Sequence, residues 1–217
     1  MRRLRITPFR LAVAIVLALL SSVGVAYAAG LGLSSNKLHA WSQTLTKGTC
    51  DQTSSTAYDT WVQEASPLNT AGGTDTTFTI GGAAGSRDYA FIRFDLSGCS
   101  LPATAGADSA TLTLTVTSKS NDTISLFPVY SSWSASTLNW AGAGGLTIGS
   151  TATTTFVPSS TGGLTVPVTA DVDAAIKAGA FWGWELRDTS GTSTCAIGAS
   201  ENPAAGKRPS MTLGYEK

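Results

Sequence analysis

The stretch from Asp88 to Leu96, DYAFIRFDL, decides which fold the sequence adopts. In a β-strand successive side chains point to opposite sides, so this stretch would present two different faces. The first face is apolar and consists of Ala90, Ile92, Phe94 and Leu96. The second consists of Tyr89, Phe91, Arg93 and Asp95. We therefore predict a strand with its first face in a core and a second face that needs its own explanation.

Two interpretations of the second face stay open. If it faces solvent, it offers two rings and a cation in a row of about 13 Å, the length of about two to three sugar units. If a loop or the leader segment covers it, Arg93 forms a structural ion pair with an acid such as Asp95 or Glu201. The exposure of Arg93 and its neighbouring rings distinguishes the two.

Other segments repeat the strand pattern. In ATLTLTVTS (110–118) the residues Leu112, Leu114 and Val116 alternate with threonines, which is typical of a half-buried antiparallel strand. Further short segments rich in Thr, Val, Ile and aromatic residues are separated by clusters of Gly, Ser, Asn and Pro. They are TAYDTWVQE, TTFTIGG, ISLFPVY, GLTVPVT, FWGWELRD, TCAIGASE and PSMTLGYE.

One segment carries a helical signal, TADVDAAIKAG at residues 169–179. Thr169 is a candidate cap, Asp171 and Asp173 suit a helix N-terminus, and Gly179 suits its end. About eight or nine short strands with one brief helix predict an all-β fold, an antiparallel jelly-roll β-sandwich with one short helix.

The first 28 residues predict a signal peptide. A basic start, MRRLRITPFR, precedes an apolar run that ends in the small residues Ala26 and Ala28, and we expect cleavage after Ala28. The apolar run is shorter than the roughly 20 residues of a membrane span. A retained N-terminal anchor and, from Arg2 and Arg3, a twin-arginine export route are the alternatives. We predict a secreted, extracellular protein.

Cleavage would leave a leader segment (29–49) and one domain (50–217). The signal peptide contains four of the 14 Lys and Arg residues, so ten remain against 14 Asp and Glu. A net charge of about −4 argues against nucleic acid or a membrane surface as the main partner.

Three cysteines are disulfide candidates in an exported chain: Cys50, Cys99 and Cys195. They predict one bridge and one leftover thiol, with three pairings open. Their spacing fits no zinc motif, and the one histidine, His39, has no partner nearby. We expect no cofactor, with a structural calcium ion in a loop as the alternative.

The sequence carries no motif of a catalytic site. It has no Gly-x-Ser-x-Gly elbow, no phosphate loop and no second histidine. The acids Asp171 and Asp173 are explained by the dipole of the predicted helix. A glycosidase pair from separate strands would leave no local spacing. We predict that the protein is not an enzyme.

Tryptophans are the residues that point most clearly to sugars, because their flat faces stack on sugar rings. They also fill cores, and we expect Trp133, Trp140 and Trp184 to do so. For Trp61 and Trp182 both interpretations stay open.

The order of several segments resembles the DNRLRE domain, also classed as carbohydrate-binding module family 96. The segments are DTWVQEASPLNTAGG, YAFIRFDLSGCSLP followed by SATLTL, the W-x6-W spacing of Trp133 and Trp140, VTADVDAAIKAG with GWELRD, and SEN with KRPSMTLGY. The resemblance runs from about residue 50 to 216. It implies a secreted, usually bacterial jelly-roll module, found alone or attached to polysaccharide-degrading enzymes and wall proteins. Known binders of the family take acidic polysaccharides such as alginate through basic side chains.

Single positions carry over from that resemblance. Arg93 matches the arginine of the RFDL motif, Asp59 the acid of the first strand and Trp61 an aromatic position, while Glu201 and Arg208 match the late Glu and Arg-Pro positions.

The sequence departs from the family pattern at two places. Ala135 stands where the family tends to have an acid, and Ala199, Ser200 and Glu201 replace Ser-Arg-Glu. Together with the negative net charge, these changes weaken the expectation of a polyanionic ligand.

We therefore predict a secreted, non-catalytic module that binds a polysaccharide. The candidate carbohydrate-binding residues are Trp61, Tyr89, Phe91, Arg93 and Trp182. The rival class is a structural or adhesive cell-wall-associated domain without a sugar site.

Overall fold

The computed structural model describes residues 47–53, 55–102 and 105–216. The predicted signal peptide and most of the leader segment, with His39 and Trp41, lie outside the described residues. The described residues belong to one compact unit. No helix within these ranges is long and apolar enough to cross a membrane.

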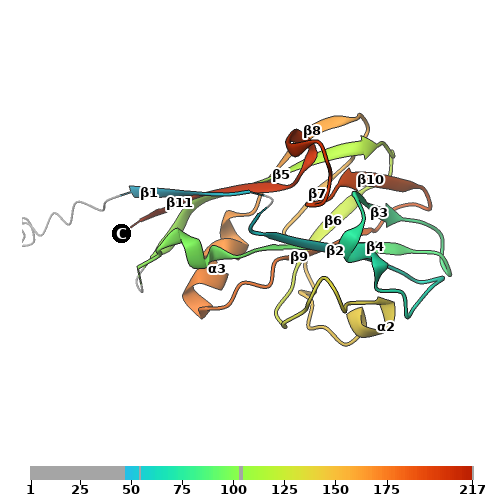
Figure 1. The fold of residues 1–217 in the computed structure, drawn as a ribbon, viewed down its shortest axis with the longest axis horizontal. Helices are drawn as coiled ribbons and strands as arrows, with labels where there is room; N and C mark the ends of the chain where they lie inside the picture. The colour runs from blue at the N-terminus through green and yellow to red at the C-terminus, as the bar shows by residue number, and fades with distance from the viewer. Residues whose placement is uncertain (1–46, 54, 103–104, 217) are drawn as a thin grey trace, which may run out of the picture. The chain divides into compact units, whose positions relative to one another are not determined.

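Strands dominate the described chain (Figure 1). The eleven strands are β1 (Lys47–Gln52), β2 (Ala57–Gln63), β3 (Thr77–Gly81), β4 (Asp88–Phe94), β5 (Gly106–Ser118), β6 (Ile124–Pro128), β7 (Thr154–Phe156), β8 (Gly162–Pro167), β9 (Trp184–Asp188), β10 (Thr194–Gly198) and β11 (Ser210–Glu216). The helices are α3 (Thr169–Ala178) and the short turns α2 (Trp140–Ala143), η1 (Ala71–Thr74), η2 (Leu96–Cys99) and η3 (Ala205–Lys207). All strand pairs are antiparallel, so the predicted all-β fold with one short helix is confirmed.

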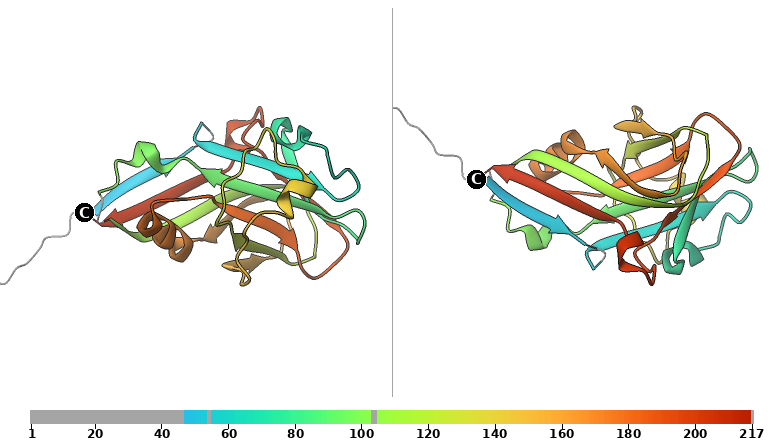
Figure 2. Two further views of the ribbon diagram at one scale, coloured as in Figure 1. Left: turned by 90° about the horizontal axis from the view of Figure 1, so that it is seen from below. Right: turned by 90° about the horizontal axis from the view of Figure 1, so that it is seen from above.

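The strands form two layers that continue into one another (Figure 2). In the first layer β11 lies between β1 and β5, β8 pairs with β5, and β10 joins β5 to β3. In the second layer the order is β2, β4, β9, β6, β7. The layers connect where β3 meets β4, at the pair Gly81 and Asp88. The layers form a β-sandwich, for which the jelly-roll connectivity stays a prediction.

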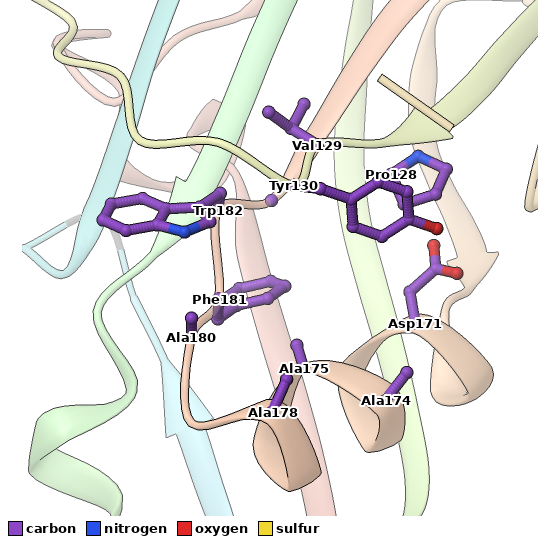
Figure 3. A pocket seen from close by; sticks show the side chains of 11 residues that line it. Pro128, Val129, Tyr130, Asp171, Ala174, Ala175, Ala178, Ala180, Phe181 and Trp182 are labelled. Carbon is purple, nitrogen blue, oxygen red and sulfur yellow. The ribbon is translucent and has the colours of Figure 1, made fainter. Parts of the chain in front are cut away.

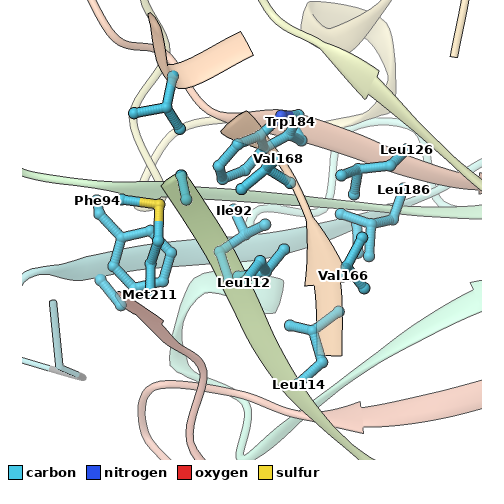
Figure 4. Packing of buried hydrophobic residues seen from close by; sticks show 14 of the residues in the cluster. Ile92, Phe94, Leu112, Leu114, Leu126, Val166, Val168, Trp184, Leu186 and Met211 are labelled. Carbon is cyan, nitrogen blue, oxygen red and sulfur yellow. The ribbon is translucent and has the colours of Figure 1, made fainter. Parts of the chain in front are cut away.

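The main core lies between the two layers (Figure 4). Ile92 and Phe94 of β4 face Leu112 and Leu114 of β5, and all four are at most 1% exposed. Burying an aliphatic or aromatic side chain of this size contributes about 1.5–3 kcal/mol. The apolar alternate side chains of β4 and β5 therefore hold the two layers together. The predicted inner face of β4 is confirmed.

Helix α3 follows β8 and packs on β5. It ends at Gly179, whose φ of 67° is left-handed, as expected for the residue after a helix. The predicted cap Thr169 is wrong. Val168 occupies the N-cap position, and the Thr169 hydroxyl instead accepts a hydrogen bond from the Ala110 amide at 2.9 Å.

One disulfide joins Cys50 of β1 to Cys99 of η2, and Cys195 is a buried free thiol. Burial raises the pKa of Cys195 to about 12, which keeps that thiol protonated. The prediction of one bridge and one leftover cysteine is confirmed. A cross-link between cysteines 49 residues apart stabilises the fold by about 2–4 kcal/mol, mainly by restricting the unfolded chain.

Candidate functional site

The outer face of β4, which points away from the main core, is partly covered. Residues 129–149, the covering segment, cross it and build a second apolar cluster there. Phe91 is completely buried in this cluster, with its ring 5.8 Å from that of Trp133. The middle of the face is therefore an interior surface, and Phe91 contacts no solvent.

Arg93 lies at one end of this face, among rings. Its guanidinium carbon is 4.3 Å from the ring centre of Tyr58, its cross-strand partner on β2. The ring centres of Trp133 and Trp182 are 5.5 and 5.7 Å away. Positively charged groups are attracted to the faces of such rings at these distances. The rings hold the guanidinium in place, and no acid among the described residues forms an ion pair with it.

The structural ion pair considered for Arg93 is wrong. Among the ion pairs of the described residues, none includes Arg93. Its buried Nε also has no hydrogen-bond acceptor there. Asp95 instead accepts from the Ser97 amide at 2.9 Å, a bond that lowers the pKa of Asp95, while nearby Arg93 adds a smaller effect. Glu201 bonds to Ser200.

Trp182 reaches Arg93 because the chain at Gly183 runs unusually close to β4. A Cβ at Gly183 would overlap the carbonyl oxygen of Ile92, and the residue has a left-handed φ of 73°. Both conditions favour glycine. The carbonyl of Trp182 accepts a hydrogen bond from Trp133 Nε1 at 2.7 Å, which fixes the segment against the covering segment. Trp182 remains half-buried.

Two depressions flank Trp182. The Arg93 groove, of about 780 Å³, is lined by Arg93, Asp95, Leu101, Lys177, Phe181 and Trp182 among others. The second depression, which we call the hollow, has about 370 Å³ and lies between the covering segment and α3 (Figure 3). Trp182 and Phe181 line both. The two depressions together form a continuous candidate binding surface around Trp182.

The structure separates the other predicted site residues from this surface. Tyr89 shares the face of Arg93 but packs at its other end, 4.7 Å from the ring of Trp140. Trp61 lies on the opposite face of the sheet, where it packs against the main core and donates from Nε1 to Asp75 at 2.7 Å. Of the five predicted residues, the structure brings together Arg93 and Trp182.

Two of the predicted core tryptophans are buried, Trp133 and Trp184, at 7% and 0% exposure. Trp140 is half-buried and packs on the second cluster. Three contributors were missed by sequence reasoning: Tyr58 beside Arg93, and Tyr130 and Asp171 in the hollow. Tyr58 is 40% and Tyr130 62% exposed. The alternation in TAYDTWVQE could have indicated on which face of its strand Tyr58 lies. It could not indicate that Tyr58 pairs with Arg93, because the pattern of one strand does not contain the register between strands.

The family positions Asp59 and Glu201 lie away from the groove. Asp59 is 1% exposed and accepts from the Ser200 amide at 2.8 Å. Burial, followed by the charge of Glu201, raises the pKa of Asp59 to about 7. Arg208 donates from Nε to the Asn202 carbonyl at 2.6 Å. These residues fix the turn that follows β10, which is a structural task.

The described residues bring no three His, Cys, Asp or Glu side chains together as metal ligands. The structural calcium ion thus stays a prediction without an assigned site.

The comparisons with known proteins agree with the resemblance in the sequence. The model of carbohydrate-binding module family 96 matches residues 51–214, most of the chain. A search of curated proteins finds no match. Since the family model covers both layers of the sandwich and the segments around Arg93 and Trp182, the chain belongs to carbohydrate-binding module family 96.

Proposed function

We propose that the protein is a secreted, non-catalytic module that binds a polysaccharide around Arg93 and Trp182. The observation that carries this proposal is the state of Arg93, a guanidinium framed by rings, without an ion pair among the described residues and open to a groove. Family membership supports a carbohydrate as the partner.

The groove has the two kinds of group that sugars need. Trp182 and Phe181, which line the groove, offer ring faces that remove the apolar side of a sugar from water. Arg93 offers several N–H donors in a fixed plane, which fit a carboxylate or a pair of hydroxyl oxygens. Because the rings already hold the guanidinium, little side-chain freedom is lost on binding.

The acid in the groove does not suit catalysis. A general acid at neutral pH needs a raised pKa. The pKa of Asp95 is lowered instead, chiefly by the Ser97 amide, so this carboxyl stays ionised. This supports a binding role in which no bond of the glycan is broken.

An extracellular location is supported by the disulfide of Cys50 and Cys99, because such bonds persist in oxidising compartments. Export with removal of residues 1–28 is part of the proposal. N-terminal sequencing of the protein from the culture medium tests it, and a mature chain that begins at Ala29 is the expected result.

Affinity electrophoresis against a panel of neutral and acidic polysaccharides tests the binding. We expect retardation by at least one glycan, and a loss of affinity of about tenfold or more in Trp182→Ala. The matched control is Trp140→Ala, which removes a half-buried tryptophan at the other end of the same face and should keep the affinity. Absence of retardation by every glycan would contradict the proposal and favour the structural or adhesive role.

A further inference from the structure

The hollow differs from the Arg93 groove in its charge. Its lining is mostly apolar and comes from the rings of Tyr130, Phe181 and Trp182 and from alanines of α3, and Asp171 is the one charged group among the described residues that line it (Figure 3). No Lys or Arg of the described part of the chain lines it. The Arg93 groove, in contrast, contains Arg93 and Lys177 as well as the acid Asp95, and Lys177 forms an ion pair with Asp173 at 2.6 Å.

Asp171 is held firmly in the hollow. Its Oδ2 accepts hydrogen bonds from Trp184 Nε1, at 2.7 Å, and from the hydroxyl of Thr153. Its Oδ1 has no hydrogen bond to any described residue, so this oxygen remains an acceptor for a ligand. In Figure 3 the carboxylate lies on the Tyr130 side of the hollow, away from Trp182.

We propose that the hollow is a second sugar subsite that takes an uncharged unit, next to a carboxylated unit held by Arg93. The ligand is then a polysaccharide in which an acidic sugar neighbours a neutral one. This inference rests on the proposed function and specifies the ligand of the same surface.

Charge complementarity carries the assignment. A carboxylated sugar in the hollow would meet Asp171 in a partly enclosed, apolar site, where like charges repel more strongly than in water. A neutral sugar would instead donate a hydroxyl to Asp171 Oδ1 and lay its apolar face on Tyr130 or Trp182. The volume of about 370 Å³ falls in the range of about 300–1,000 Å³ that is usual for ligand pockets.

The two subsites are close enough for neighbouring units of one chain. Trp182 lines both depressions, and its ring centre lies 5.7 Å from the guanidinium carbon of Arg93. A polymer that crosses Trp182 therefore meets the cation on one side and the carboxylate on the other. A polymer with a carboxylate on every unit can pair with Arg93 but is repelled by Asp171.

Binding constants of the secreted protein for two classes of polymer test this inference. The mixed class is hyaluronan, unsulfated chondroitin and glucuronoxylan, and the uniform class is alginate and polygalacturonate. We expect the best mixed polymer to bind on the order of tenfold more tightly than either uniform one. Uniform polymers that bind as tightly as every mixed one would overturn the inference.

Two substitutions locate the effect. Ala174 is exposed on α3 and lines the hollow but not the groove, so Ala174→Leu should fill the hollow and weaken binding of the mixed polymer several-fold. Ala170→Leu, on the exposed part of the same helix outside both linings, is the matched control and should bind as the wild type does. Asp171→Asn keeps an acceptor for Trp184 but removes the charge, and it should reduce the preference for mixed over uniform polymers.

The results separate this inference from the proposed function. If Arg93→Met abolishes binding while Ala174→Leu and Asp171→Asn leave affinity and preference unchanged, the groove binds glycan and the second subsite is refuted. If no polymer binds at all, the proposed function fails and the inference fails with it. Should Asp171→Asn not fold, the comparison of Ala174→Leu with Ala170→Leu still decides.

Discussion

The two ends of the outer face of β4 carry the same chemical groups in different states. At one end Arg93 lies over Tyr58 and has no ion pair among the described residues. At the other end Arg87 lies 5.7 Å from the ring centre of Trp140. Arg87 also donates two side-chain hydrogen bonds to Glu64, at 2.8 and 2.7 Å. We call these the open end and the closed end.

An arginine over an aromatic ring does not by itself mark a binding site, because both ends have one. At the closed end an acid already takes the directional donors of the guanidinium, so the ring contact serves the fold. At the open end the rings hold the cation, and the guanidinium nitrogens other than the buried Nε remain as donors for a ligand. The two ends differ because Glu64 pairs with Arg87 at the closed end. Substitutions at either end can remove this difference.

The largest effect is expected from Phe91, which lies between the two ends. Phe91→Ala would leave a cavity in the second cluster and should lower the free energy of unfolding by about 3–5 kcal/mol. Chemical denaturation measures the change. A loss below about 1 kcal/mol would mean that the covering segment is not packed on β4 as described.

Gly183 should be next, because it brings Trp182 to the open end. Gly183→Ala forces a Cβ against Ile92 in a left-handed conformation, so a loss of about 1–3 kcal/mol in stability is expected. Glycan affinity should fall as Trp182 moves away from Arg93. Gly85→Ala is a control with a left-handed φ of 89° but open space around it and a place outside both depressions, and it should lower stability without lowering affinity.

Tyr58 tests the ring support of Arg93 itself. Tyr58→Leu removes the closest ring while keeping an apolar side chain, and a cation–π contact at such an exposed position is worth about 0.5–1 kcal/mol. Isothermal titration with the best glycan should show a two- to fivefold weaker affinity, on the order that this energy predicts. Tyr130→Leu would serve as the comparison in the hollow. An unchanged affinity in Tyr58→Leu would show that Arg93 needs no ring to hold it.

The smallest effect on stability is expected when the ion pair of Arg87 with Glu64 at the closed end is removed. Hydrogen bonds from Arg87 lower the pKa of Glu64 to about 2. Because this pKa is lower in the folded state than in the unfolded one, Glu64 stabilises the fold above about pH 4.5 and loses that effect as the pH falls through about 2. The difference in thermal midpoint between wild type and Glu64→Gln should therefore shrink from pH 5 to pH 2. A difference that stays constant over this range would contradict the assignment.

Much of the fold was predictable from alternation in single strands. From Ala90 to Phe94 of β4 and from Ala110 to Val116 of β5, one set of alternate residues is wholly apolar, so the buried face is unambiguous in both. The alternate sets of β2 are mixed: Ala57, Asp59, Trp61 and Gln63 on one side, and Tyr58, Thr60 and Val62 on the other. That mixture is why sequence reasoning could not tell on which side of the sheet Trp61 lies.

The site was less predictable because it depends on contacts between distant segments. Arg93 and Trp182 were both candidates, but their meeting depends on the close approach at Gly183. The expected ion pair of Arg93 failed because Asp95 and Glu201 bond to the neighbouring serines, Ser97 and Ser200. The partner that each acid takes depends on the direction of the local backbone. The spacing of residues in the sequence does not reveal that direction.

The open end is the proposed glycan site because Arg93 forms no ion pair with any described residue. The most direct test compares Arg93→Met with Arg87→Met by isothermal titration against the best-binding polysaccharide, after both variants have been checked for folding. We expect Arg93→Met to weaken binding on the order of tenfold or more, while Arg87→Met, which removes the same charge from the closed end, should stay within about twofold of the wild type. Equal losses in the two variants, or a larger loss in Arg87→Met, would contradict the proposal.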